Sequence, residues 1–204
     1  MAERDTTPAR LTPARVLLVA VLAIVVTLGV AVLIAAVLSF HVKGTSMTPT
    51  LSDGDRILVD PFSDGSDVGR FEIVALRHDN ARIVKRVIGL PGDEVRIDPV
   101  DDGAEVFVRP RDADGWQRVA APVWRDNWGD VRRCCGSDGT SGAQRRAVVP
   151  DGSYFVLGDN PAISDDSRIY GWVRSDDVGQ ILLRVYPLER VGGVSGDFRL
   201  VPAG

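Results

Sequence analysis

The chain is poor in the side chains that most often bind metals or carry out chemistry. Its 204 residues include two histidines, two cysteines and two lysines, against 22 arginines. Isolated histidines and adjacent cysteines match none of the ligand spacings of known metal sites, so we predict neither a metal nor another cofactor. The net charge is −4 and no cluster of Lys and Arg on a helix is evident, so we do not expect nucleic acid as a partner.

The two cysteines, Cys134 and Cys135, are consecutive, which restricts the bonds they can form. Across a trans peptide their α-carbons would lie about 3.8 Å apart, below the usual disulfide range. A strained disulfide between neighbours, two free thiols and a link to another chain all remain open in an oxidising exterior. Loop cysteines need no function, and the sequence assigns none to this pair.

Charged residues are absent from one long stretch, residues 16–40. At about 1.5 Å rise per residue, a helix of this length crosses a hydrocarbon core of roughly 30 Å. The apolar region of a cleaved signal peptide is only about 7 to 15 residues long, so the length favours a retained anchor. We therefore predict a single-pass protein of the lipid bilayer with its transmembrane helix at residues 16–40.

Basic residues around this stretch predict its orientation. Three arginines precede it and two basic residues follow it: Arg4, Arg10, Arg15, Lys43 and Arg56. The more basic flank of a membrane helix usually stays in the cytoplasm. This modest bias predicts that residues 1–15 are cytoplasmic and that residues 41–204 lie on the outer side of the cell membrane.

Short apolar runs separated by turn signals fill most of residues 41–204. The runs are 56–59, 71–76, 82–90, 94–97, 106–108, 153–157 and 180–186. Outside the membrane segment, no stretch of ten or more residues shows the period of a helix. We therefore predict a mainly antiparallel β domain. Residues 98–152 are rich in Asp, Gly and Arg, which indicates a polar, solvated insertion of one or two hairpins.

Lys85 is notable in a chain that otherwise uses arginine for positive charge. An arginine stays protonated in a protein, whereas a desolvated lysine can lose its proton and act as a base. In the strand predicted at 82–90, alternation puts Lys85 on one face with Ile83 and Val87. Burial there would lower the pKa of Lys85 below its ordinary value. An amine that reaches out to water from a strand end is the alternative.

Ser46 lies six residues after the predicted anchor, in a turn-rich segment where a substrate emerging from the bilayer would meet it. A serine becomes an effective nucleophile when a base removes its proton, and a neutral lysine is a known partner. His41 abuts the anchor, and His78 is expected in a hairpin turn. A Ser-His-Asp triad that uses His78 is therefore disfavoured, though open. Ser46 and Lys85 together predict a membrane-anchored protease.

Four sequence boxes resemble those of bacterial type I signal peptidases. They are GTSMTPTL at 44–51, GD at 54–55, KRVIGLPGD at 85–93, and GDN at 158–160 continuing to GWV at 171–173. Four boxes in this order behind a membrane helix are a specific signal. The resemblance implies an endopeptidase that removes signal peptides from exported preproteins by a Ser-Lys mechanism. It also implies the largely β protease fold that these enzymes share with self-cleaving repressors.

The resemblance assigns roles to individual residues. Ser46 would be the nucleophile and Lys85 the general base, while Ser164 would hydrogen-bond the lysine amine and orient it. Three further residues would brace the loop that carries Ser164: Asp159, Asp166 and Arg168.

The oxyanion hole is the point at which this chain departs from part of that family. The backbone N–H of Ser46 would form one half of it. Some members supply the second donor from a Ser or Thr hydroxyl two positions before the nucleophile, where this chain has Gly44. A backbone N–H, such as that of Gly44, or the Thr45 hydroxyl would then have to serve.

The resemblance also implies the substrate, a preprotein signal peptide with small residues, typically Ala, at the first and third positions before the cut. A strand-rich cleft suits an extended peptide that adds to a strand edge. Two other functions remain open: a catalytically silent, membrane-tethered β module that binds other proteins, and an intramolecular protease that cuts its own chain. The absence of a DNA-binding segment before the anchor argues against the second.

Aromatic residues allow two interpretations. Trp116, Trp124 and Trp128 lie in the polar insertion and Phe40 at the end of the apolar stretch. Such side chains fill a core or anchor a domain at the lipid interface.

Overall fold

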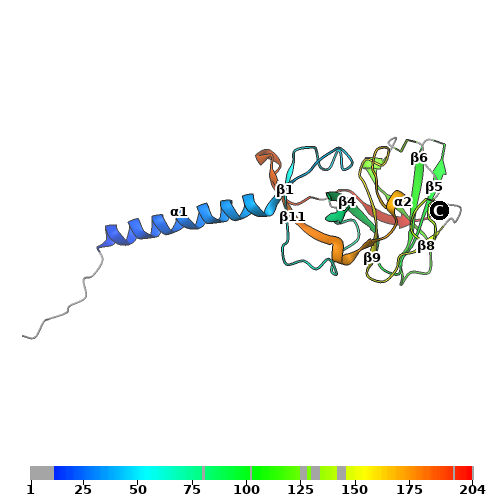
Figure 1. Ribbon diagram of the computed structural model, residues 1–204, viewed down its shortest axis with the longest axis horizontal. Coiled ribbons are helices and arrows are strands. Elements are labelled where there is room, and N and C mark those ends of the chain that lie inside the picture. Colours follow the sequence, from blue (N-terminus) through cyan, green and yellow to red (C-terminus); the bar gives the residue numbers. More distant parts are fainter. Residues whose placement is uncertain are drawn as a thin grey trace, which may run out of the picture. The chain divides into compact units, whose positions relative to one another are not determined.

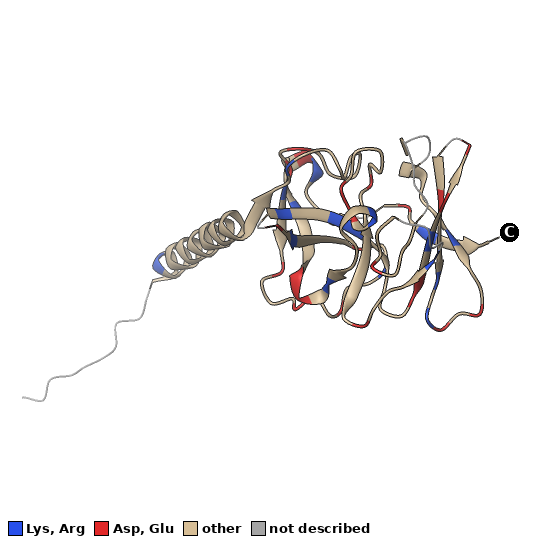
Figure 2. Ribbon diagram, turned by 45° about the vertical axis from the view of Figure 1, so that its right-hand side comes forward, with Lys and Arg blue, Asp and Glu red and all other residues tan. Residues whose placement is uncertain are grey.

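The computed structural model describes residues 12–79, 81–101, 103–124, 128–129, 134–141, 146–194 and 196–203. The chain divides after Leu38 into a helical unit and a β unit, Ser39–Gly204. The helical unit holds α1, Pro13–Leu38, whose 26 residues have no buried member. Arg15, near its start, is its one charged residue (Figure 2).

By length and composition α1 is able to cross a membrane. Its Thr27 hydroxyl donates to the Ala23 carbonyl at 2.8 Å. This bond gives the hydroxyl an acceptor, which the lipid hydrocarbon cannot provide. The helix ends at Leu38, two residues before the apolar stretch does, because Ser39 and Phe40 belong to a strand. The predicted segment at residues 1–15 falls mostly outside the described residues.

The β unit contains two antiparallel sheets (Figure 1). The larger has seven strands, in the order β1 (Ser39–His41), β2 (Arg56–Val59), β11 (Val178–Tyr186), β3 (Ile73–His78), β4 (Ala81–Gly89), β9 (Ser153–Leu157) and β10 (Val173–Arg174). The smaller has five, in the order β12 (Arg199–Pro202), β7 (Gln117–Ala120), β6 (Gly103–Arg109), β5 (Glu94–Val100) and β8 (Ala147–Val148). Short helices lie between some of these strands: α2 (Ser167–Tyr170), η1 (Pro122–Trp124), η2 (Ser175–Asp177) and η3 (Leu188–Arg190).

The fold class predicted from sequence is confirmed. The predicted runs 56–59 and 153–157 coincide with β2 and β9, and the other five overlap observed strands. The strands that the sequence missed, β1, β7, β8, β10 and β12, have four residues or fewer, which is too short for a clear alternation.

The largest core cluster joins the two sheets. Ile88 of β4 and Phe155 of β9 pack with Val95 and Val106 of the smaller sheet. At Gly89 the sheets approach so closely that an added Cβ would lie 2.7 Å from a Val95 methyl. The space between the sheets is therefore filled by side chains of both.

Residues 98–152 are less solvated than predicted. Trp124 and Trp128 are only 5% and 4% exposed and belong to the joint core, so they fill the core and do not reach a lipid interface. The sequence pattern was misleading because the strands of this region are short and carry polar residues on their outer face.

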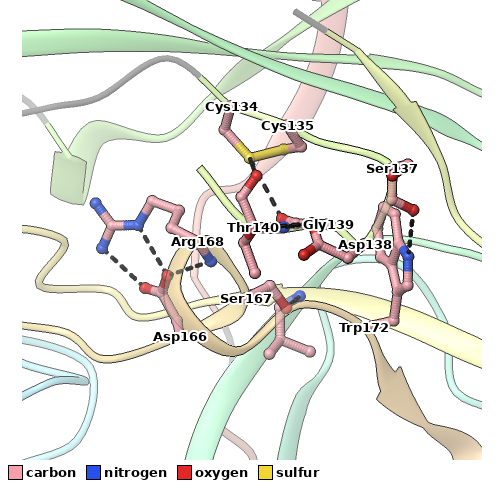
Figure 3. The surroundings of a disulfide bond; sticks show 11 residues. Cys134, Cys135, Ser137, Asp138, Gly139, Thr140, Asp166, Ser167, Arg168 and Trp172 are labelled. Carbon is pink, nitrogen blue, oxygen red and sulfur yellow. Dashed lines mark hydrogen bonds and ion pairs between the residues drawn. A yellow bond between two sulfur atoms is a disulfide. The ribbon is translucent and has the colours of Figure 1, made fainter. Parts of the chain in front are cut away.

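Cys134 and Cys135 form a disulfide with each other and are fully buried in the same core (Figure 3). Their peptide bond is cis, so their α-carbons lie 3.0 Å apart and not at the trans spacing assumed from sequence. Of the three states left open, the structure has the disulfide between neighbours.

Candidate active site

Lys85 and Ser46, which are 39 positions apart in the chain, meet in the β unit. Lys85 lies within β4, where it is opposite Val74 of β3, and it is 3% exposed. Its Nζ donates a hydrogen bond to Ser46 Oγ at 2.7 Å. The structure therefore brings together the two residues that the sequence singled out, at the distance that proton transfer requires.

Burial lowers the pKa of Lys85 below its ordinary value of 10.5, because a desolvated ammonium is disfavoured. The carboxylates of Asp166, Asp165 and Asp159 oppose this shift, and the Arg168 guanidinium adds to it. Desolvation is the largest of these effects, so the site favours a neutral amine.

Buried side chains and turn hydrogen bonds hold the segment that carries Ser46. Met47 and Leu51 are buried at 1% and 0% exposure, and turns close it through Thr48 N–H to the Thr45 carbonyl at 3.1 Å and Leu51 N–H to the Met47 carbonyl at 2.9 Å. Ser46 itself is half-buried.

The loop after β9 holds Ser46 from the other side. Asn160 donates its backbone N–H to the Ser46 carbonyl at 2.9 Å and its side-chain amide to the Thr45 carbonyl at 3.2 Å. Gly158, two residues earlier, lies so close that an added Cβ would be 2.5 Å from the Ser46 carbonyl oxygen and 2.6 Å from the Ser164 Cβ. Only glycine fits at this position without displacing the nucleophile.

Asp166 and Arg168 bind each other and the loop beside Ser46. Arg168 binds the Asp166 carboxylate through Nε at 2.8 Å and through a terminal nitrogen at 2.9 Å, and it also donates to the Pro161 carbonyl at 2.8 Å (Figure 3). The same carboxylate accepts the Gly158 N–H at 3.1 Å. One fully buried acid therefore links α2 to the loop beside Ser46.

Asp159 has a partner that the sequence reasoning missed. Arg86, adjacent to Lys85, donates to its two carboxylate oxygens at 2.8 and 2.6 Å, and both residues are fully buried. Asp159 also accepts from the Thr50 hydroxyl. The Arg86 guanidinium lies 4.0 Å from the Phe198 ring centroid, so a residue near the end of the chain covers this pair.

Ser164 differs from its implied role. It is 4% exposed, but its hydroxyl makes no hydrogen bond to any described residue, Lys85 included. The Lys85 amine is directed to Ser46, and Ser164 packs against Gly158. An orienting bond from Ser164 is therefore not formed in this structure.

Of the candidates for the second oxyanion donor, Gly44 is already engaged. Its backbone N–H donates to an Asp53 carboxylate oxygen at 2.8 Å. The Thr45 side chain is exposed, and among the described residues nothing accepts from the Ser46 N–H.

The alternative base, His78, is remote from Lys85. It ends β3 four positions past Val74, which is the residue opposite Lys85, and at about 3.3 Å per residue this is about 13 Å along the strand. Its ring instead stacks on Tyr170, with centroids 4.3 Å apart. No group of three potential metal ligands occurs among the residues that the structure describes.

Comparison with known proteins identifies the family. The family model for signal peptidase, peptidase S26, matches residues 14–186. The chain belongs to the S26 signal peptidase family. Signal peptidase I V of Bacillus subtilis is 32% identical over 71% of this chain and 82% of its own.

Two further proteins are similar to this chain. A probable signal peptidase I-2 of Synechocystis is 32% identical over 77% of this chain and 66% of its own length. A solved signal peptidase I from Enterococcus faecalis is 28% identical, covering 57% of this chain and 97% of that one with a TM-score of 0.42. The predictions of a signal peptidase I and of a serine protease hydrolase are thereby confirmed, and α1 fits a single-pass membrane member of this family.

Proposed function

We propose that Ser46 is the nucleophile and Lys85 the general base of a membrane-anchored endopeptidase that removes signal peptides from exported preproteins. The observation that carries this assignment is the 2.7 Å contact between Lys85 Nζ and Ser46 Oγ, made by a lysine that is 3% exposed. A buried lysine whose pKa is lowered by desolvation can act as a base, and the Ser46 hydroxyl at hydrogen-bond distance is the group that it deprotonates.

In this mechanism Lys85 takes the Ser46 proton as Oγ attacks the scissile carbonyl, and then gives that proton to the departing amine of the mature protein. The acyl group stays on Ser46 as an ester. Lys85 next takes a proton from a water molecule, whose oxygen attacks the ester, and gives that proton to Ser46 Oγ as the signal peptide leaves. Asp166, Arg168 and Asp159 act through the loop that fixes the Ser46 carbonyl, and Ser164 acts by packing beside Gly158.

The Ser46 N–H and the Thr45 hydroxyl are the pair of oxyanion donors that we favour. The Gly44 N–H would first have to leave the Asp53 carboxylate. Loss of one oxyanion donor costs about 2.7 to 4 kcal/mol in other enzymes, so Thr45 is a sensitive position in this proposal.

The signal peptide binds in extended form at the free edge of β4. On its β9 side, β4 is paired only from Arg86 to Gly89. The preceding residues, Ala81 to Lys85, have no described strand on that side, so their backbone groups are available to an added peptide strand. Such a strand would run directly past Lys85, with small side chains entering next to Ser46.

The anchor sets the place of action. The basic flank before α1 favours an N-terminus in the cytoplasm, and the β unit then lies outside, where signal peptides are removed. The lipid bilayer would bring α1 and the apolar part of a signal peptide into one layer.

The test is cleavage in trans. The purified protein in detergent is incubated with a preprotein that has Ala at the first and third positions before the cut, and the products are identified by mass. Cleavage at that bond by the wild type and by the control Ser66→Ala, but not by Ser46→Ala, supports the proposal. Binding without cleavage would indicate a silent module, and cleavage of the enzyme chain alone would indicate a self-cleaving protease.

A further inference from the structure

The edge of β4 changes at the catalytic lysine. Before Lys85 it is free, and from Arg86 onward β9 occupies it, with Arg86 opposite Leu157. A peptide strand that follows the free edge therefore cannot continue along β4 past the active site. It must leave the sheet there, and the next surface it meets is the loop that follows β9.

That loop borders a pocket of about 600 Å³. The pocket is lined by residues 161–165, by Arg168 and Ile169 of α2, and by Thr140 and Ser141. The pocket adjoins the nucleophile because Asn160, the residue before Pro161, donates to the Ser46 carbonyl, and because Ser164 packs on Gly158 beside that carbonyl.

Thr140 and Ser141 are held in place by contacts with Arg168 and with the disulfide segment, and Figure 3 shows Thr140 next to Cys134. Ser141 donates its N–H to the Arg168 carbonyl at 2.8 Å, and Ser141 also bridges to Cys134, which in turn bridges to Ile97 of β5. The pocket is therefore built between two fixed segments of the chain.

Among the described residues that line it, the pocket has one charged side chain without an ion-pair partner. The Arg168 guanidinium is neutralised by the buried Asp166. Asp165 is exposed and makes no ion pair with any residue in the described part of the chain. It lies within electrostatic reach of the catalytic amine, since its carboxylate acts on the pKa of Lys85.

We propose that this pocket binds the first residues of the mature protein, just after the bond that is cut, and that Asp165 makes it prefer a basic over an acidic side chain there. This inference rests on the proposed function. The exposed Ile163 and Ile169 supply apolar contact to the stem of such a side chain, and the Asp165 carboxylate faces its charged end.

The test uses peptides that share one sequence up to the cut and carry Lys, Asn or Asp at the second position after it. For the wild type we expect kcat/KM to be about two- to fivefold higher with Lys than with Asp, the size that one exposed charge pair gives. Asp165→Asn should abolish the preference, and Asp165→Lys should invert it. The matched control is Asp112→Asn, an exposed acid outside the pocket, which should keep the wild-type ratio.

The ratio between peptides isolates the pocket, because any effect of Asp165 on the pKa of Lys85 changes all three rates alike. Equal ratios in the wild type and Asp165→Lys would overturn the inference. Absence of cleavage with every peptide would instead contradict the proposed function. The two failures are therefore distinguishable.

Discussion

Gly158→Ala adds one methyl group to the loop that holds the nucleophile. The new Cβ would lie 2.5 Å from the Ser46 carbonyl oxygen and 2.6 Å from the Ser164 Cβ. Neither neighbour can rotate away, because one is backbone and the other is the first atom of a buried side chain. To restore ordinary contact at 3.4 Å, the Ser46 carbonyl would have to retreat by about 0.9 Å.

The expected cost has two parts. Overpacking of a well-filled site costs about 1–3 kcal/mol of folding stability. A displacement of about 1 Å between reacting groups lowers a rate about 100-fold, and here it acts directly on the distance between Ser46 and Lys85. We therefore expect kcat/KM to fall far more than the loss of folded protein would explain.

The assay combines kcat/KM on a preprotein peptide with urea unfolding of the same sample. Gly115→Ala is the control, because a Cβ there has no atom within 4 Å, and it should leave both quantities near wild type. Adding Ser164→Gly to Gly158→Ala removes one of the obstructed contacts and should restore part of the stability. Activity of Gly158→Ala within threefold of wild type would refute this account of how Ser46 is held.

Three further predictions concern the base, the buried ion pair and topology. Lys85→Arg should be as inactive as Lys85→Ala, because guanidinium stays protonated, and the wild-type kcat/KM should rise with pH as a group titrates below 10.5. The free energy of unfolding should also rise with pH between the pKa of Lys85 in the folded protein and 10.5, because in this range only the unfolded state still holds the proton. Lys85→Met should remove this pH dependence. Arg86→Met should cost about 3–5 kcal/mol in urea unfolding by leaving Asp159 buried and unpaired, while Arg86→Met with Asp159→Leu should recover much of it; a single-variant cost below about 1 kcal/mol would contradict the pairing. Protease added to intact spheroplasts should degrade the β unit, and complete protection would mean that the orientation is inverted.

Ser46 and Lys85, which the structure brings into contact, could be singled out from sequence because both of their signals are local. Lys85 alternates with Ile83 and Val87 in one strand, and Ser46 lies in a turn just after an apolar stretch. The anchor was predictable for the same reason. Local patterns of this kind persist whatever the rest of the chain does.

Arg86 shows why the rest was not predictable. Arginine is rarely buried unless it is paired, so the residue type gave no reason to place Arg86 in the core. Its burial depends on Asp159 and Phe198, which follow it by 73 and 112 positions and leave no periodic signal near residue 86. Three strands of the smaller sheet, β7, β8 and β12, were missed similarly, because such short strands become stable only when they pair and cover the joint core.

Phe198, which covers Arg86, is synthesised after all the other residues of the proposed site. The ribosome delivers Ser46 first, then Lys85 and Arg86, then Asp159, and Phe198 more than 150 residues after the nucleophile. Phe198 also packs edge-on against Trp124 and precedes β12, the strand that borders β7. A nascent chain that has inserted its helix therefore carries the nucleophile and the base while the structure around them is incomplete. We expect proteolytic activity to begin only once this late segment has emerged.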